Sequence, residues 1–325
     1  MSETTAAIRP PEPDWSTITA VELAAYCTAE NRFRASGAAR AMTGEPDPGA
    51  VIRWQEVALP GRDLPVRVHR PAAGSADGGA LPVVLHVHGG GFVGTATQCD
   101  WVTSHVAARL PAVVVSVEHW LLAPDTPLSA AADDGWDVLR HVLGHAREWG
   151  VDPARTAVFG ESCGALIGAL AVLRASEAGL ALRAQVLVNP ATDVTDAMLD
   201  HPSIAAYGRG PGLSVAQLRF FRRLAVPPGA DARALSPLYA ADLSGLPPAL
   251  VVVPTDDPLA DHGRRYAERL LAAGTVVRLT EHPGARHAFL SVPGLERRAT
   301  AARTEILEFL RTRLATQGGR PAMWE

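Results

Sequence analysis

The sequence has no lysine, and all 30 of its basic residues are arginine. Without lysine the chain cannot use Schiff-base chemistry or a lysine-dependent phosphate loop. The 34 acidic residues give a net charge of −4, and neither sign forms a long run. Such a chain lacks the clustered positive charge that binds nucleic acid or an anionic membrane, so we expect neither as a partner.

Cysteine and long apolar runs are also scarce. The three cysteines, Cys27, Cys99 and Cys163, are widely spaced and form no CxxC pair, which argues against a disulfide framework and a thiolate zinc site. The N-terminal segment MSETTAAIRPPEPDW has no apolar targeting region, and no stretch reaches the roughly 18 consecutive apolar residues of a membrane span. We therefore expect a cytoplasmic protein.

Hydrophobic residues are abundant, at 47% of 325 residues, which is enough for a sizeable core. From Pro82 onward, short apolar runs alternate with segments of helical length and periodicity. Because continuous apolar strands are typical of parallel sheets, this alternation predicts a doubly wound α/β fold. The expected strands are 83–87, 112–117, 156–160, 184–189, 249–253 and 275–279, and the expected helices are 99–110, 128–149, 163–178, 260–273 and 295–314.

Three segments fall outside this alternation. Residues 19–40 are predicted to form a helix that begins with a capping box at Thr19 and Glu22. Residues 51–59 and 64–70 are predicted to form an antiparallel hairpin. Residues 191–245 are too long for a simple crossover and contain an expected helix near 214–224. We expect this last stretch to fold over one end of the sheet.

The pentapeptide Gly160-Glu161-Ser162-Cys163-Gly164 lies between an expected strand and an expected helix. A serine at such a sharp turn projects above the sheet edge, and the glycines on both sides relieve crowding around it. The pattern GxSxG also arises by chance in glycine-rich chains, but here the flanking strand and helix supply the context that it needs. This segment predicts that Ser162 is a nucleophile.

A second glycine-rich segment, HGGGF at 88–92, directly follows the strand at 83–87. Consecutive glycines let backbone N–H groups approach a substrate oxygen and stabilise an oxyanion. We expect Gly90, Gly91 and the amide of Cys163 to be the donors. A flexible turn or a phosphate cradle is the alternative, although GGGFVG lacks the GxGxxG spacing of dinucleotide sites.

A serine nucleophile needs a base, and the base needs a carboxylate that fixes its tautomer. Asp257 and His287 each follow an expected strand, so both should lie at the same sheet edge as Ser162. Asp256 is an adjacent competitor for the acid, and His282 is a weaker competitor for the base. The order Ser, Asp, His along the chain is that of an α/β-hydrolase.

Together these motifs resemble the hormone-sensitive-lipase-like carboxylesterases of the α/β-hydrolase superfamily, over approximately residues 15 to 315. The matching segments are HGGGF at 88–92, GESCG at 160–164, SPL at 236–238, DPL at 257–259 and HAF at 287–289. The chain departs from the family at Glu161, Cys163 and Ala288, where Asp, Ala and Gly are usual. It also has HWLLAPD at 119–125 where the family has DYRLAPE, which alters the polar packing beneath the oxyanion loop.

The resemblance implies an α/β-hydrolase fold with a mostly parallel sheet, helices on both faces and a helical cap. Its expected parts are an N-terminal cap segment at 1–50, a first core part at 51–190, a cap insertion at 191–233 and a second core part at 234–325. It also implies a serine carboxylesterase that requires no cofactor or metal.

We therefore interpret the chain as an esterase that hydrolyses short-chain acyl esters through Ser162, His287 and Asp257. Two alternatives stay open: an amidase or acyltransferase on the same triad, and a receptor of the same fold without turnover. The oligomeric state is also open, a homodimer included. The aromatic residues expected to bind substrate are Phe92, Trp101, Trp120, Phe220 and Phe221.

Overall fold

The computed structural model describes residues 8–74, 78–210 and 212–315. Within them an 8-stranded sheet has the order β1-β2-β4-β3-β5-β6-β7-β8. The strands are β1 (Ala50–Leu59), β2 (Arg62–Pro71), β3 (Leu81–Val87), β4 (Val113–Val117), β5 (Val151–Glu161), β6 (Ala184–Val188), β7 (Ala249–Asp256) and β8 (Val277–Arg286). The β1-β2 and β2-β4 pairs are antiparallel, and the remaining pairs are parallel.

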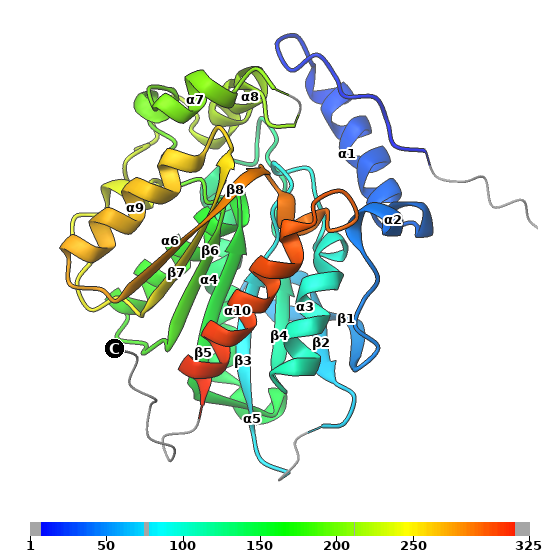
Figure 1. Ribbon diagram of the computed structural model, residues 1–325, viewed down its shortest axis with the longest axis vertical. Helices are drawn as coiled ribbons and strands as arrows, with labels where there is room; N and C mark the ends of the chain where they lie inside the picture. The colour runs from blue at the N-terminus through cyan, green and yellow to red at the C-terminus, as the bar shows by residue number, and fades with distance from the viewer. Residues whose placement is uncertain (1–7, 75–77, 211, 316–325) are drawn as a thin grey trace, which may run out of the picture.

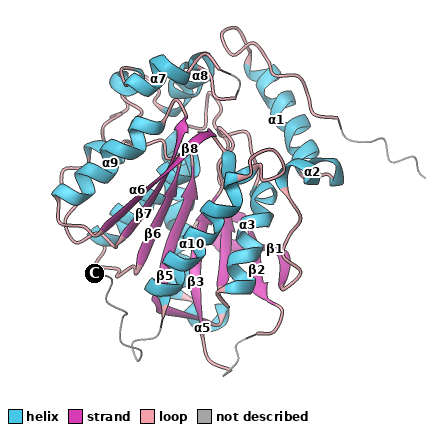
Figure 2. Cartoon of the chain, in the orientation of Figure 1, coloured by secondary structure: helices cyan, strands magenta, loops and turns pink. Residues whose placement is uncertain are grey.

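Helices cover both faces of this sheet (Figures 1 and 2). They are α1 (Ala20–Arg34), α2 (Arg40–Thr43), α3 (Asp100–Arg109), α4 (Leu128–Gly144), α5 (Ala146–Trp149), α6 (Cys163–Glu177), α7 (Pro202–Tyr207), α8 (Val215–Ala225), α9 (Ala260–Ala272) and α10 (Arg298–Leu314). The predicted doubly wound α/β architecture is confirmed.

The apolar strands build two cores because successive side chains point to opposite faces. In β3, Val83, Leu85 and Val87 belong to a core that also contains residues of α4, α6 and α9, whereas Val84 belongs to a core on the other face with residues of α3 and α10. The continuous apolar runs in the sequence are therefore explained by burial on both sides of the sheet.

The structure corrects two predicted helices. The helix expected at 128–149 is divided at His145 into α4 and α5, and the helix expected at 19–40 is shorter than predicted. The capping box at Thr19 and Glu22 is present, but α1 ends at Arg34 and does not reach residue 40. A 3₁₀ turn at Gly37–Ala39 and the short helix α2 follow. The break comes at Ser36 and Gly37, because Ser36 takes an extended conformation that cannot continue the helix.

The segments expected to form the cap lie at one end of the sheet, where α1, α7 and α8 are grouped (Figure 1). Aromatic side chains join them, because the Trp15 ring lies 5.6 Å from Phe220 and 5.2 Å from Phe221, both on α8. Residues 1–7 and 316–325 of the expected parts lie outside the described residues. In the described ranges, no helix is both long and apolar enough to cross a membrane.

Candidate functional site

Ser162 occupies the sharp turn between β5 and α6. Its backbone φ is 55°, in the left-handed region that residues other than glycine rarely adopt. The flanking glycines make the turn sterically feasible, because a Cβ at Gly164 would collide with the carbonyl oxygens of Val87 and His88. Such a strained, tightly packed turn is the conformation predicted for a nucleophile that projects from a sheet edge.

The structure brings Ser162, His287 and Asp257 into one hydrogen-bonded chain. The Ser162 Oγ lies 2.8 Å from His287 Nε2, and His287 Nδ1 lies 2.8 Å and 2.9 Å from the two carboxylate oxygens of Asp257. Asp257 and His287 directly follow the neighbouring parallel strands β7 and β8. Since parallel strands end at the same edge, residues far apart in sequence meet there.

The two competing residues lie elsewhere. Asp256 is the last residue of β7 and its Oδ1 accepts a hydrogen bond from Thr255 Oγ1 at 3.0 Å. His282 lies inside β8, with its ring 5.2 Å from Phe289 and its Nε2 3.5 Å from Glu305. Asp257, by contrast, is fully buried, and its Oδ1 also accepts a hydrogen bond from the backbone amide of Leu259 at 2.8 Å.

Electrostatics in this cluster favour a proton on His287. Burial disfavours the imidazolium, but the charge of Asp257, its hydrogen bond and the charge of Glu161 outweigh burial and raise the pKa of His287 above 6.5. Glu161 is itself buried, and burial raises the pKa of its carboxyl group. A base that is stabilised when protonated is suited to accept a proton from a serine hydroxyl.

Two cavities reach Ser162. The polar cavity, of about 240 Å³, is lined by Arg9, Glu12, Tyr26, Arg34, Gly90, Gly91, Val93, Ser162, Gly212, Leu213, Gln217, His287 and Ala288. The inner cavity, of about 50 Å³, is lined by Gly91, Phe92, Ser162, Cys163, Leu166, Ala191, Val194, Met198, Leu213, Leu218, Phe221, Arg222, Ala225 and Leu259. The serine therefore lies between a charged space and a small apolar one.

Of the residues expected to supply the oxyanion hole, Gly91 lines both cavities, Gly90 lines the polar cavity and Cys163 lines the inner cavity. Gly90 and Gly91 have φ values of +106° and +64°, which glycine tolerates. Cys163 begins α6, so its amide is one of those without a partner inside the helix. Amides of Phe92 and Gly91 lie near the Cys163 thiol, yet burial dominates and raises the pKa of that thiol to about 11. Cys163 therefore borders the inner cavity as a neutral thiol.

The glycine loop is supported by side chains that sequence reasoning missed. Arg34 from α1 donates hydrogen bonds to Glu30 Oε1 at 2.9 Å and to Gln98 Oε1. A Cβ at Gly90 would lie only 2.6 Å from Arg34 Nη1 and 3.1 Å from Gln98 Nε2. The Arg34–Gln98 pair thus packs directly on the loop, and nothing in the local sequence marks either residue.

A carboxylate supports the segment that follows this loop. Glu118 Oε2 accepts hydrogen bonds from the amide of Ala96 at 2.8 Å and from Thr95 Oγ1 at 3.1 Å. The ring of His119 stacks on that of His88 at 4.2 Å. These groups lie in the polar layer beneath the glycine loop. The sequence had indicated only that this layer differs from that of the family, because HWLLAPD replaces DYRLAPE at 119–125.

The five aromatic residues expected to bind substrate separate into two groups. Phe92 and Phe221 line the inner cavity. Phe220 is buried against Trp15, and Trp101 lies under the Arg303 guanidinium at 3.7 Å, so neither is among the described residues that line the two cavities. Trp120 is 53% exposed and borders a different cavity. The structure therefore places Trp101, Trp120 and Phe220 outside the two cavities that reach Ser162, because hydrophobicity alone does not tell where a side chain packs.

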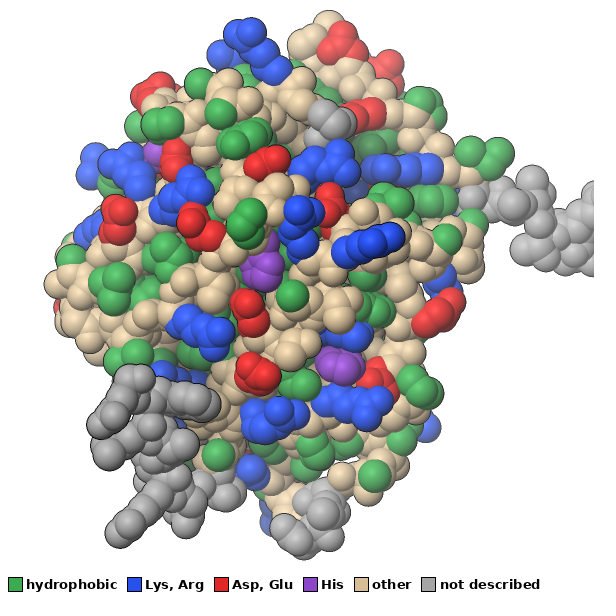
Figure 3. Space-filling view, viewed as in Figure 1, with side chains coloured by type: hydrophobic (Ala, Val, Ile, Leu, Met, Phe, Trp, Pro, Cys, Tyr) green, Lys and Arg blue, Asp and Glu red, His purple; other side chains and the backbone are tan. Residues whose placement is uncertain are grey.

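The rest of the described chain offers no obvious metal site, since no group of three or more His, Cys, Asp or Glu residues is arranged to hold an ion. Charges of both signs are interspersed on the face that Figure 3 shows, and they do not gather into a patch of one sign.

Comparisons with known proteins agree with this geometry. A family described as alpha/beta hydrolase fold matches residues 84–291. Esterase LipI of Mycobacterium tuberculosis is 35% identical over 271 residues, which cover 80% of this chain and 82% of LipI. Ethyl acetate hydrolase of Pseudomonas putida is 34% identical over 265 residues, which cover 78% of this chain and 80% of that protein.

A solved structure is similar over nearly the whole length. It is an ester hydrolase from the metagenome of Lake Arreo, complexed with a derivative of bipyridine phosphonate. It is 31% identical to this chain with a TM-score of 0.83, and the match covers 94% of both chains.

Proposed function

The chain belongs to the hormone-sensitive-lipase-like carboxylic ester hydrolases of the α/β-hydrolase family, and from this membership we propose that Ser162, His287 and Asp257 form its catalytic triad. The observation that carries the proposal is the continuous hydrogen bonding from Ser162 Oγ through His287 to Asp257. Three groups of these types, joined in this order, are the arrangement that activates a serine hydroxyl.

Acylation is the first half of the reaction. Ser162 Oγ attacks the ester carbonyl carbon while His287 Nε2 accepts the hydroxyl proton, and Asp257 holds the other ring nitrogen. The carbonyl oxygen becomes an oxyanion, which accepts hydrogen bonds from the amides of Gly90, Gly91 and Cys163. When the intermediate collapses, the C–O bond to the alcohol breaks and His287 returns the proton to the departing oxygen.

Deacylation repeats these steps with water. His287 takes a proton from a water molecule, whose oxygen attacks the carbonyl carbon of the acyl-enzyme. The same amides stabilise the second oxyanion. Collapse breaks the bond to Ser162 Oγ, which recovers its proton from His287, and the carboxylic acid is released.

The preferred substrates are esters with short acyl chains, from acetyl to about hexanoyl. The inner cavity of about 50 Å³ supports this limit, because that volume holds roughly three to five water-sized groups. Its lining includes the apolar side chains of Phe221, Leu218 and Met198. The similar protein from Pseudomonas putida is named for its action on ethyl acetate, which also favours small acyl groups.

A panel of nitrophenyl esters tests this preference. We expect kcat/KM to rise over the first few carbons, because each buried methylene contributes about 0.8 kcal/mol, and to fall once the inner cavity is full. The panel runs from acetate through butyrate, hexanoate and octanoate to palmitate. An optimum at octanoate or longer would contradict a closed acyl cavity.

Related acyl-transfer reactions are separated by a second assay. Matched anilide and nitrophenyl ester substrates with one acyl group distinguish an amidase from an esterase, and added alcohols reveal acyl transfer. We expect ester hydrolysis to dominate. A receptor without turnover is disfavoured, because such a protein does not need three aligned catalytic side chains.

We further propose that residues 1–50 and 191–233 act together as the cap of the site, over the core parts 51–190 and 234–325. The proposal is supported by Tyr26 and Arg34 from the first segment and Leu213 and Gln217 from the second, all of which line the polar cavity with Ser162. A cap of this kind limits access to the serine. We also propose a cytoplasmic location, on the sequence evidence above.

A further inference from the structure

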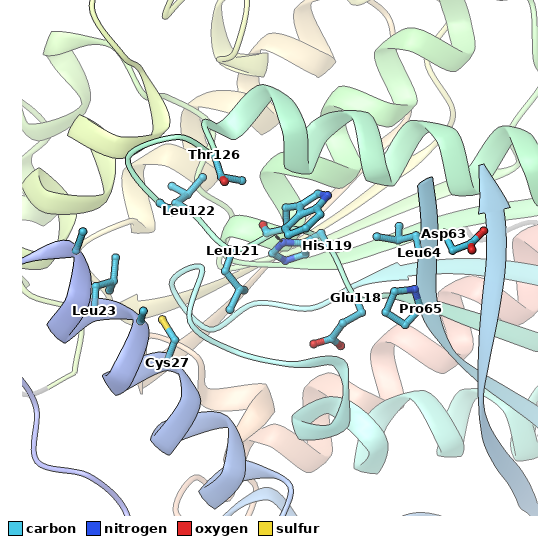
Figure 4. A pocket seen from close by; sticks show the side chains of 14 residues that line it. Leu23, Cys27, Asp63, Leu64, Pro65, Glu118, His119, Leu121, Leu122 and Thr126 are labelled. Atoms are coloured by element: carbon cyan, nitrogen blue, oxygen red, sulfur yellow. Dashed lines mark hydrogen bonds between the residues drawn. The ribbon is translucent and has the colours of Figure 1, made fainter. Parts of the chain in front are cut away.

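A third cavity, which we call the α1 cavity, lies between α1 and the segment after β4 (Figure 4). Its volume is about 500 Å³, and Ser162 and His287 are not among the described residues that line it. Figure 4 shows Leu23 and Cys27 of α1 on one side, Leu64 and Pro65 of β2 on the other, and Leu121 between them. A mostly apolar space of this size is typical of sites for small organic ligands, which measure about 300 to 1,000 Å³.

The charges that line the α1 cavity are all negative. They belong to Asp63 and Glu118, and the described lining contains no arginine. The polar cavity at Ser162 differs in this respect, because Arg9 and Arg34 line it together with Glu12. An anionic ligand would therefore be repelled from the α1 cavity and a cationic one attracted.

Among the described residues, no arginine forms an ion pair with Glu118, and the Nε2 of His88 lies 4.0 Å from its Oε2. The Glu118 side chain is 23% exposed, and its Oε2 accepts hydrogen bonds only from Thr95 and Ala96. Burial lowers the pKa of His88 to about 4 and that of His119 to about 3, so both rings are neutral at physiological pH. The burial of Glu118 likewise raises the pKa of its own carboxyl group, as expected for a carboxylate removed from water.

The charge of Arg67 acts on Glu118 and lowers its pKa against the effect of burial, but this arginine is paired with another carboxylate. Arg67 donates from Nε and Nη2 to the two carboxylate oxygens of Asp100, both at 2.6 Å. The α1 cavity therefore combines mostly apolar walls with a carboxylate that has no arginine partner of its own among the described residues.

We propose that the α1 cavity binds a small organic ammonium compound with an apolar body. The ammonium group lies beside Glu118, and the apolar body contacts Leu23, Leu64 and Leu121. Trp120, which also borders the cavity, adds an aromatic face of the kind that attracts cations. This site does not depend on the proposed catalytic triad, because the two share no lining residue among those described.

Calorimetry with three matched probes tests the proposal on the full chain at neutral pH. The probes are phenethylamine, phenethyl alcohol and hydrocinnamate, which carry positive, zero and negative charge on similar bodies. We expect the amine to bind about tenfold or more tightly than the alcohol, and the acid not to bind. Equal binding of the amine and the alcohol would overturn the assignment of an ammonium ligand.

Two variants locate the binding. Ala24→Phe places a ring in the α1 cavity and should abolish binding of the amine, whereas Ala25→Phe, at an exposed position of the same helix outside the lining, should leave it unchanged. Leu121→Trp fills the cavity from the opposite side and replaces Ala24→Phe if that variant does not fold. Amine binding that survives a folded, filled variant would show that the site lies elsewhere.

The role of Glu118 is tested separately. Glu118→Gln keeps an oxygen that can accept the hydrogen bond from the amide of Ala96, but it removes the negative charge of the carboxylate. We expect the affinity for the amine to fall to that of the alcohol, while the affinity for the alcohol stays the same. If the variant keeps the full preference for the amine, Glu118 does not recognise the ammonium and the proposal fails.

Discussion

Helix α1 borders both the polar cavity and the α1 cavity, but the two spaces differ in charge and in the elements that form them. At the polar cavity, Arg34 packs on the loop at Gly90, and Ser162 and His287 come from strand ends. At the α1 cavity, Leu23 and Cys27 face a loop whose charged groups are acidic. One helix thus presents arginine to one site and apolar side chains to another.

This difference shows which parts of the fold fix the positions of side chains most precisely. Ser162, Asp257 and His287 each directly follow a strand in the parallel part of the sheet, so the hydrogen bonds between β5, β6, β7 and β8 fix their separation. The walls that α1 and α8 supply depend on side-chain packing between distant segments, such as Trp15 against Phe221. Substitutions of the residues at the strand ends should therefore abolish ester hydrolysis, whereas substitutions on the helices should change its rate to a smaller extent.

The largest effect should come from Ser162→Ala. Removal of the nucleophile should reduce kcat by about four to six orders of magnitude, because the triad acts as a unit. Hydrolysis of nitrophenyl butyrate measures the loss, and circular dichroism checks the fold. Amine binding in the α1 cavity should persist in this variant, which separates the two sites.

Covalent labelling gives the control for this variant. A phosphonate should attach to Ser162 in the wild-type chain, as identified by peptide mass analysis. A label on another serine would show that the nucleophile has been assigned wrongly.

The next largest loss of kcat is expected at Asp257, and it should distinguish this residue from the adjacent Asp256. Asp257→Asn should lower kcat by about ten-thousandfold, because the amide no longer favours the required imidazole tautomer. Asp256→Asn is the matched control and should do much less, since Asp256 bonds to Thr255 and not to His287. Steady-state kinetics of both variants measure the contrast, and reversed severity would place the acid at Asp256.

Arg34→Ala should have an intermediate effect, because Arg34 acts as a positioning residue through the oxyanion loop. We expect kcat to fall about tenfold to a hundredfold with KM little changed, as for a small displacement of catalytic groups. Arg32→Ala, at an exposed position of the same helix, is the control.

A readout specific to the oxyanion site accompanies the kinetics of Arg34→Ala. Affinity for a trifluoromethyl ketone, which forms a tetrahedral adduct, should fall in parallel with kcat. Arg34→Lys should recover part of both. A lower melting temperature with unchanged kcat would instead indicate a purely structural role.

The smallest expected effect concerns pH. Because Asp257 and Glu161 raise the pKa of His287, the acid limb of kcat/KM should lie above pH 6.5. Activity needs the neutral imidazole, so it is lost as pH falls through that limb. Glu161→Gln removes a negative charge, which should lower the pKa of His287 and move the limb to lower pH. An unmoved limb would show that Glu161 carries no charge during the titration.

Much of the catalytic arrangement could be predicted from sequence because its signals are local. The glycines around Ser162, the apolar runs that end just before Asp257 and the glycines of 89–91 each mark a strand end with a functional residue. Parallel strands then bring those ends together whatever their separation along the chain. The confirmed α/β-hydrolase fold follows from the same alternation of strands and helices.

Only the tertiary structure decided which side chains surround the reacting groups. Sequence placed Trp120 and Trp101 at the acyl pocket by their hydrophobicity, but one borders the α1 cavity and the other packs under Arg303. No local pattern indicated that Arg34 would pack against the loop at Gly90, or that Glu118 would line the α1 cavity without an arginine partner among the described residues. These contacts join segments distant in the chain, and their geometry depends on how helices pack on the sheet, which local pattern does not encode.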